Sequence, residues 1–231
     1  MIDLRLYNLD AGIGKLALNA DVAYFGGDDF SPTNKVESSA GWALGAILVS
    51  DLSDNVANRV SAQYGVGAAE NFKTVMTAPQ GLDLPTTPVV TTDDAKRLRL
   101  TDDIVIKTGT PVSLQAVAIY EHYDNGMGTD IDWVSLGARP VYHFNKYFSL
   151  AFEGGADYTN QEDGPEGVLG KFTLAPQIQA GRDHFSRPSI RAFATYAVWT
   201  GSDDFERSVA PVSYGADTQG FSFGVQMEAW W

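Results

Sequence analysis

Apolar and polar residues alternate along most of this chain with the period of two that an extended strand imposes. Residues 220–231 show the pattern most clearly. Six apolar residues there share one parity, and the other parity is polar or small except for Trp230. An amphipathic helix would instead repeat its apolar residues every three or four positions. The chain is therefore predicted to be all β.

The alternation predicts about eleven strands. Pro176 falls inside one of them and predicts a bulge or a weakened ladder bond, because proline has no N–H to donate. Residues 42–50 are apolar on both faces, so periodicity does not separate this segment from a buried strand of another kind. The predicted strands cover residues 2–9, 15–25, 42–50, 59–66, 97–107, 112–123, 132–144, 148–159, 171–180, 189–199 and 220–231.

The connections between these strands are predicted to alternate between short and long along the whole chain. The longest, at about residues 69–95, is rich in Pro and Thr. Loops of that length without structure of their own are uncommon in compact soluble domains. Outer-membrane barrels have tight turns at one end and long loops at the other, so the pattern favours such a barrel.

The polar faces of the predicted strands carry charges of both signs, more than a packed soluble core tolerates unpaired. A soluble sandwich or lipocalin-like barrel would place the apolar face inside, and periodicity alone does not tell inside from outside. The aromatic chain end and the loop pattern favour lipid against the apolar face. The predicted fold class is therefore an antiparallel up-and-down transmembrane β-barrel. The charged polar-face residues are Lys15, Asp21, Arg59, Arg139, Glu153, Asp157, Lys171, Arg191 and Glu228.

Composition excludes several other classes of protein. The formal charge of -13 argues against nucleic-acid binding, which needs basic stripes. No apolar run reaches the roughly 18 residues of a membrane-spanning helix. There are no cysteines for disulfides, thiol catalysis or cysteine metal sites. Pairs of acidic residues between the strands predict solvated loops, and a divalent-cation site is the alternative. The pairs are Asp28-Asp29, Asp93-Asp94, Glu162-Asp163 and Asp203-Asp204.

The odd strand number carries an expectation about domain organisation. Bacterial single-chain barrels have even numbers of strands. In an up-and-down meander the first and last of eleven strands run in the same direction, so they do not pair antiparallel. The first residues also lack a basic segment followed by an apolar core, the mark of a signal peptide. We expect residues 1–231 to be the C-terminal portion of one larger barrel domain, with N-terminal strands and signal peptide absent from this sequence.

The sequence contains no recognisable catalytic motif. There is no GxSxG, HExxH, P-loop or GxGxxG, and His122, His143 and His184 show no metal-ligand spacing. A glycosidase needs two carboxyl groups at a set separation, which acidic pairs in loops do not establish. The prediction is a protein that is not an enzyme and that uses no cofactor.

The remaining chemical signal is aromatic rings on polar faces. A ring offers apolar contact to the C–H face of a pyranose, while neighbouring Arg, Asp and Glu hydrogen-bond its hydroxyls. The alternative is that each ring belongs to the aromatic belt at the membrane interface, or that it fills space near a rim of the barrel. The rings are those of Trp230, Trp199, Phe193, Phe185, Trp133 and Phe25.

Several segments of the sequence resemble one protein family. The chain ends Gly-Val-Gln-Met-Glu-Ala-Trp-Trp at 224–231, and residues 186–197 read Ser-Arg-Pro-Ser-Ile-Arg-Ala-Phe-Ala-Thr-Tyr-Ala. Residues 172–181 read Phe-Thr-Leu-Ala-Pro-Gln-Ile-Gln-Ala-Gly, and 137–140 read Gly-Ala-Arg-Pro. These segments, in this order, are similar to the C-terminal strands of maltoporins, the sugar-specific porins of Gram-negative outer membranes.

The resemblance implies a trimer of barrels of about 18 strands each, through which maltodextrins diffuse along a slide of aromatic residues beside charged ones. Trp230 and Phe185 match slide positions, whereas Ala57, before Asn58, stands where another slide aromatic would be. The family's constriction loop and its other slide residues belong to the N-terminal half, which is not in this sequence. The expected substrate-binding residues are Trp230, Phe185, Trp199, Trp133, Arg191, Glu228 and Asn58.

The predicted function is passive, facilitated diffusion of maltose or maltodextrin-type sugars across the bacterial outer membrane. The expected partners are a maltooligosaccharide or related sugar, membrane lipid and two further copies in a homotrimer, with no nucleic acid. Two other classes stay open: a non-specific porin or barrel piece acting as surface anchor or phage receptor, and a soluble carbohydrate-binding β domain.

Overall fold

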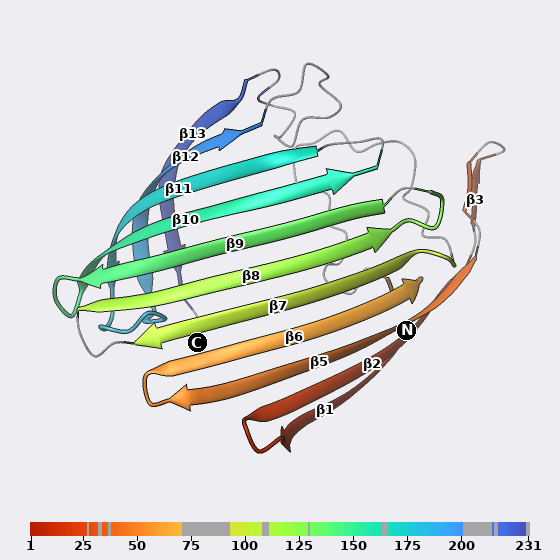
Figure 1. Cartoon of the computed structure of the whole chain (residues 1–231), viewed down its shortest axis with the longest axis horizontal. Coiled ribbons are helices and arrows are strands. Elements are labelled where there is room, and N and C mark those ends of the chain that lie inside the picture. Colours follow the sequence, from red (N-terminus) through yellow and green to blue (C-terminus); the bar gives the residue numbers. More distant parts are fainter. Residues whose placement is uncertain are drawn as a thin grey trace. The chain divides into compact units, whose positions relative to one another are not determined.

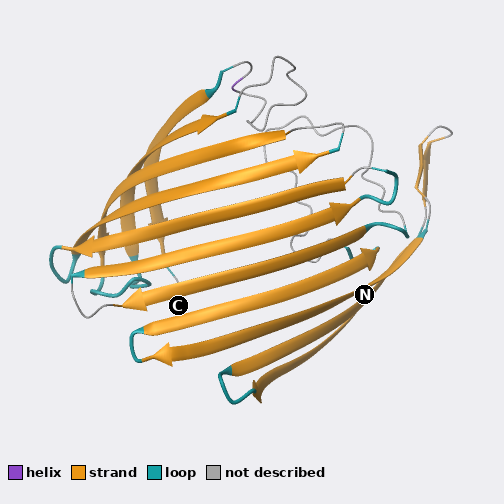
Figure 2. Ribbon diagram, in the orientation of Figure 1, coloured by secondary structure: helices purple, strands orange, loops and turns teal. Residues whose placement is uncertain are grey.

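The computed structural model describes most of the chain as β-strand (Figures 1 and 2). No helix among the described residues has both the length and the apolar character needed to cross a membrane. The described residues are 1–26, 28–31, 34–36, 38–70, 93–107, 111–128, 130–162, 166–200, 214 and 217–229.

Eleven antiparallel strands form one up-and-down sheet in the order β1-β2-β5-β6-β7-β8-β9-β10-β11-β12-β13, and β3 and β4 form a separate hairpin. The first strands are β1 (Ile2–Asp10), β2 (Lys15–Phe25), β3 (Asp28–Ser31), β4 (Asn34–Val36), β5 (Ser39–Ser53) and β6 (Val56–Gly67). They are followed by β7 (Lys96–Lys107), β8 (Val112–Asp124), β9 (Asp130–His143), β10 (Phe148–Gln161), β11 (Glu166–Gln179), β12 (Ser189–Trp199) and β13 (Gln219–Glu228).

The contacts divide the chain into two compact units. Unit 1 comprises Met1–Leu48, Ser61–Leu100 and Glu121–Ile131, and unit 2 comprises Val49–Val60, Thr101–Tyr120 and Asp132–Trp231. The side-chain clusters described below each lie within one unit.

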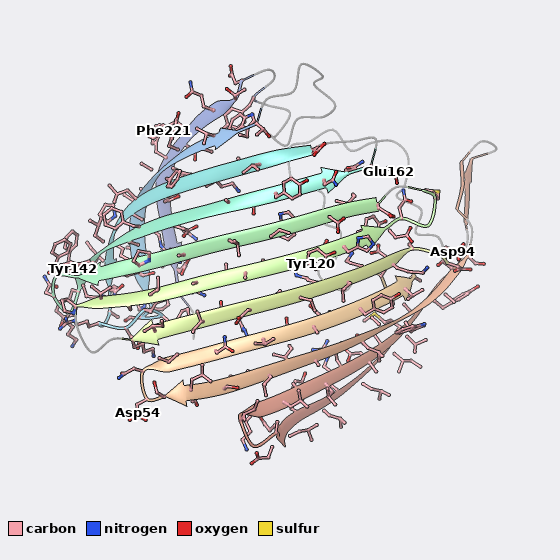
Figure 3. All side chains as sticks on the ribbon, in the orientation of Figure 1. Asp54, Asp94, Tyr120, Tyr142, Glu162 and Phe221 are labelled. Carbon is pink, nitrogen blue, oxygen red and sulfur yellow. The ribbon has the colours of Figure 1, made fainter. Side chains whose placement is uncertain are left out.

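The two faces of the strands differ in exposure in a way that reverses the pattern of soluble proteins. On β11, Ile178 is 63% exposed while its neighbour Gln179 is 2% exposed. On β10, Phe152 is 51% exposed whereas Ser149 is fully buried. We call the side with the exposed large apolar residues the apolar face, and the other side the polar face. Figure 3 shows Phe221 and Tyr142, both of the apolar face, directed away from the strands.

The sheet confirms the eleven predicted strands and corrects several details. The hairpin of β3 and β4 lies in the predicted 26–40 loop, so Asp28 and Asp29 belong to a strand and not to a loop. Strand β11 begins at Glu166, five residues before the predicted start at 171. Short connections follow β1, β5, β7 and β9, but the connection 180–188 is longer than 125–129 and 162–165, so the predicted alternation does not hold along the whole chain.

The predicted bulge at Pro176 is absent from the described pairing. The register with β10 runs unbroken through Leu150 and Pro176. Towards β12 the register is kept, but no pairs form at residues 175 and 176, which is the expected loss of a ladder bond. A register shift occurs instead between Leu6 and Leu9 of β1, where Asn8 has a φ of 58°. Asparagine tolerates this left-handed conformation better than most residues.

In unit 1, a buried ion network holds the end of β6 against β7 and β8. Arg97 donates from Nε to Glu70 Oε2 at 2.8 Å and from Nη1 to Glu121 Oε1 at 2.5 Å. Arg99 Nη1 lies 2.8 Å from Glu121 Oε2. The Arg97 guanidinium also lies 4.1 Å from the ring centroid of Tyr123. Glu70 and Glu121 are almost fully buried, so their charges depend on these two arginines.

Glu121→Gln removes the carboxylate that two arginines share. We expect unfolding free energy to fall by about 3 kcal/mol, because breaking a buried ion pair leaves charge without a partner. Urea unfolding of the protein folded in detergent or lipid measures this loss. The control is Asp10→Asn, which breaks the exposed pair with Lys15 and is expected to have no measurable effect. An equally small effect of both substitutions would contradict a stabilising role for the network.

Candidate functional site

The polar face of unit 2 contains a hollow of about 500 Å³ lined by β7 to β11. The polar-face side chains that line it share one parity on each strand, while Leu136, Ala138, Gly154 and Ala156 of the other parity complete the lining. We call this feature the polar hollow. Its polar-face side chains are Asp103, Gln115, Val117, Trp133, Ser135, Arg139, Glu153, Asp157, Lys171 and Thr173.

The charges of the polar hollow are paired with one another. Arg139 donates from Nε to Glu153 Oε2 at 2.7 Å, and Lys171 Nζ lies 3.7 Å from Asp157 Oδ2. The side chains of Arg139 and Glu153 are 33% and 46% exposed. The two pairs cancel in charge and keep donors and acceptors open to solvent. Such a surface suits a neutral, hydroxyl-rich ligand better than an ion.

Asp103 extends the hydrogen-bonding surface towards β6. Gln115 donates from Nε2 to Asp103 Oδ2 at 2.8 Å, and Arg59 lies 4.0 Å from the same carboxylate. Thr173 and Thr195 share a hydroxyl hydrogen bond of 2.7 Å on the neighbouring strands. Acceptors and donors thus continue from one strand to the next across this face.

Among the predicted substrate-binding aromatics that the structure describes, Trp133 is the one that lines the polar hollow. Its strand, β9, also supplies Ser135 and Arg139 at the same parity. The indole is half-buried, so part of it faces the hollow. An aromatic surface beside charge-assisted donors and acceptors is the combination that recognises a pyranose.

Two other predicted residues, Arg191 and Glu228, contact each other. Arg191 Nη2 lies 2.9 Å from Glu228 Oε2, and Arg187 forms a second ion pair with the same oxygen. Arg191 is 7% exposed, so its guanidinium is committed to this cluster. The pair links the start of β12 to the end of β13.

Phe185 lies in the connection between β11 and β12, with its side chain exposed. Its ring packs edge-on against the His184 imidazole, with centroids 5.1 Å apart. The backbone N–H of Phe185 donates to Asp183 Oδ1 at 3.0 Å, which shapes this turn.

Phe193 and Trp199 face the polar side but pack over glycines of β13. A Cβ on Gly224 would lie 2.9 Å from Phe193 Cζ, and one on Gly220 would lie 3.2 Å from Trp199 Cη2. Trp199 is buried, donates from Nε1 to Asp217 O at 2.6 Å, and packs against the Tyr214 ring. Phe193 also covers a small apolar cluster, formed by Val141, Ala151 and Ala175.

The structure places Asn58 apart from the other predicted residues. Asn58 shares its parity with Val60 on the apolar face, where it donates from Nδ2 to Asp102 Oδ1 at 2.5 Å. It is therefore not part of the polar hollow. Trp230 and the side chain of Phe25 lie outside the described residues.

Sequence reasoning found the charges of the hollow but not their arrangement. Arg139, Glu153, Asp157 and Lys171 were predicted on polar faces without being assigned to a site. Asp103 and Gln115 were missed, although both have the polar parity of their strands. Among the described residues, no group of three or more His, Asp or Glu side chains is placed to hold a metal ion. Figure 3 shows Asp94 and Glu162, from two of the acidic pairs, at strand ends.

Comparison with known proteins gives the family context of this surface. A sequence-family model described as LamB porin matches residues 1–231. One similar solved structure is OmpT, an outer membrane protein of Vibrio cholerae folded in vitro. It is 12% identical, and the match covers 92% of this chain and 74% of that chain with a TM-score of 0.47.

The packing of Phe193 on Gly224 is testable with a double-mutant cycle. Gly224→Ala alone is expected to cost about 1 kcal/mol of unfolding free energy, because the new methyl displaces the ring. In a Phe193→Ala background, which itself costs about 2 kcal/mol, the same change is expected to gain about 0.5 kcal/mol, since glycine disfavours a strand. Urea unfolding of the four proteins gives the coupling.

Gly137→Ala is the matched control for this cycle, because the nearest side-chain atom to its added Cβ is 3.6 Å away. It is expected to show the same effect with and without Phe193. Additive effects of the Phe193 and Gly224 substitutions would refute the proposed ring-on-glycine contact.

Proposed function

Because this chain belongs to the LamB porin (maltoporin) family and is an outer-membrane porin, we propose that it conducts maltose or maltodextrin-type sugars by passive, facilitated diffusion. The observation that carries the proposal is the polar hollow, which Trp133 and two ion pairs line together. The transport step requires no covalent chemistry. It needs a surface that binds sugar weakly and repeatedly.

The chemistry of the hollow supports this substrate class. A pyranose has an apolar C–H face and a rim of hydroxyls. Trp133 offers the ring surface, and Arg139 with Glu153 offers donors and acceptors further along the same path, six residues from Trp133 on β9. The two ion pairs are each neutral, so the binding of an uncharged sugar to them depends on shape and hydrogen bonding. Exposed ion pairs also exchange partners at little energetic cost, which favours rapid release.

We extend the proposed sugar path beyond the hollow to Phe185 and Trp230, with Arg191 and Glu228 beside it. Phe185 supplies an exposed ring on the turn after β11, within the same unit as Trp133. In this proposal Trp199 and Phe193 form part of the wall of the sugar path and do not grip the sugar, because their rings pack over glycines of β13. Asn58 acts from the apolar side through Asp102 and makes no direct sugar contact.

We also propose a homotrimeric assembly in which further strands complete each barrel. Among the described residues the sheet has eleven strands, an odd number, whereas bacterial single-chain barrels have even numbers. An unpaired strand edge is unfavourable in a bilayer, because no water satisfies its backbone groups. In this proposal residues 1–231 form the C-terminal portion of the barrel domain.

The proposal predicts that maltooligosaccharides block the ionic current of the protein reconstituted in a planar bilayer. Trp133→Ala is expected to raise the half-blocking sugar concentration about fivefold, the equivalent of about 1 kcal/mol for one aromatic contact. The control is Tyr142→Ala, which removes an exposed ring from the apolar face of the same strand and leaves the block unchanged. A conducting pore that no sugar blocks would instead indicate a non-specific porin.

A further inference from the structure

The connection between β11 and β12 folds onto the polar face of unit 2. Residues 180–188 leave β11, yet Asp183 Oδ2 lies 2.9 Å from Lys107 Nζ of β7. His184 Nδ1 lies 3.0 Å from Ser113 Oγ of β8. Lys107 and Ser113 both have the polar-face parity of their strands. The connection, which we call the inward turn, therefore crosses the polar face and presents Phe185 there.

One chain of hydrogen bonds holds the inward turn, and its direction is assigned from the Gln179 amide. Gln179 Nε2 contacts the carbonyl oxygens of Gly181 at 2.5 Å and Asp183 at 3.4 Å, so this atom is the donor nitrogen of the amide. The same nitrogen lies 3.3 Å from His143 Nδ1. An amide nitrogen does not accept a hydrogen bond, so His143 Nδ1 is assigned as the acceptor here, which places the proton of the neutral ring on Nε2.

The direction continues through the serine to the turn. His143 Nε2 lies 3.0 Å from Ser113 Oγ, so its N–H donates to that oxygen. The Ser113 hydroxyl is left to donate its own proton to His184 Nδ1 at 3.0 Å. Both imidazoles are thus neutral, each accepting at Nδ1. All four side chains are buried, so water does not substitute for a lost partner.

Adding a proton to either ring breaks this chain. A proton on His143 Nδ1 would face the donor amide of Gln179. A proton on His184 Nδ1 would face the Ser113 hydroxyl, which already accepts from His143. At His143 two donors then meet with no acceptor between them. At His184 the Ser113 hydroxyl loses the acceptor of its own proton, and a positive charge is placed on a buried ring, which is costly.

We propose that the inward turn stays docked on the polar face only while His143 and His184 are neutral, and that acidification releases it and widens the path beside Phe185. Ser113, His143 and His184 are positioning residues in this scheme, and Phe185 is the group they position. The proposal rests on the proposed function only in treating the polar face as the wall of a channel.

The charges around His184 act in the same direction as the hydrogen bonds. Burial, then the positive charge of Arg139 and the neighbouring His143, lower the pKa of His184 from 6.5 to about 4, with Arg187 adding to this and Asp183 opposing it. Arg182 and Asp183 also face His143. Burial disfavours the Asp183 carboxylate, but hydrogen bonds from Lys107 and the Phe185 amide hold its pKa below the usual value. The Asp183 carboxylate therefore stays ionised as the histidines protonate, so the pH response comes from the histidines and not from the loss of the Asp183 charge.

The pH window follows from the lowered pKa of His184. A released turn exposes the imidazole, whose pKa returns towards 6.5, so the released state gains protons first as pH falls. Docking is fully favoured above about pH 6.5 and weakens down to about pH 4, below which the effect is complete. The two pKa values limit the contribution of His184 to about a 300-fold change in the docking equilibrium.

Residues 1–231 contain no cysteine, so a single introduced cysteine in this part of the protein can be labelled directly. A spin label on Phe185→Cys reports the mobility of the inward turn in lipid vesicles. Between about pH 7.5 and about pH 4.5 the labelled protein is expected to shift from an immobile to a mobile spectrum, and ionic conductance in planar bilayers is expected to rise. His184→Gln and His143→Gln keep an acceptor that does not titrate and are each expected to reduce the pH response.

Two further variants separate a specific loss of the pH response from a general failure of the protein to fold. His122→Gln removes the remaining histidine, which lies on the other parity of β8, and should leave the pH response unchanged. Lys107→Gln weakens docking at neutral pH and should raise mobility there while the histidine-dependent step persists. A pH response unaltered in both His184→Gln and His143→Gln, or no response in the parent protein, overturns the proposal. Neither readout contains sugar, so a failed sugar block would refute the transport proposal separately.

Discussion

The structure depends on one constraint: a strand directs successive side chains to opposite sides, and in this protein the two sides meet different surroundings. The apolar face exposes Phe152, Phe172 and Ile178, while the polar face encloses Ser149 and Gln179. A water-soluble domain would place these sets the other way round. In a lipid bilayer the same arrangement is favourable, because the exposed side chains meet hydrocarbon and the ladder satisfies the backbone.

On the polar face, polar and charged groups pack against one another. How deeply an ion pair is buried decides how much it contributes to the stability of the fold. Arg97 and Glu121 are buried, so the pair contributes to folding mainly through the high cost of breaking it. Arg139 and Glu153 are partly exposed, and there the net contribution to stability is small. The partly exposed pairs are the ones able to exchange a protein partner for a ligand hydroxyl. In the proposed function, the buried pairs stabilise the fold and the partly exposed pairs contact the ligand.

Much of the fold was predictable from the sequence because periodicity is local. Eleven strands and their faces follow from the alternation alone, and Asp103 and Gln115 have the parity of the hollow they line. Parity also predicts that Asn58 lies on the apolar face, because it has the same parity as Val60 on β6. The expectation that Asn58 binds substrate came from its neighbourhood in the family and not from its parity. The hairpin of β3 and β4 was missed because its segments are short and polar, without the alternation that predicts a strand.

Contacts between distant strands were not predictable in this way, and they decide what each aromatic ring does. Phe193, Trp199 and Trp133 look alike in sequence, since all three occupy polar-face positions. Phe193 and Trp199 pack over glycines of the adjoining strand, where the absence of a side chain leaves room for each ring. Trp133 lies at the hollow instead. Phe185 owes its place to a turn whose anchors, Lys107 and Ser113, come about seventy residues earlier. A ring on a polar face is therefore a ligand contact only where no neighbouring strand already covers it.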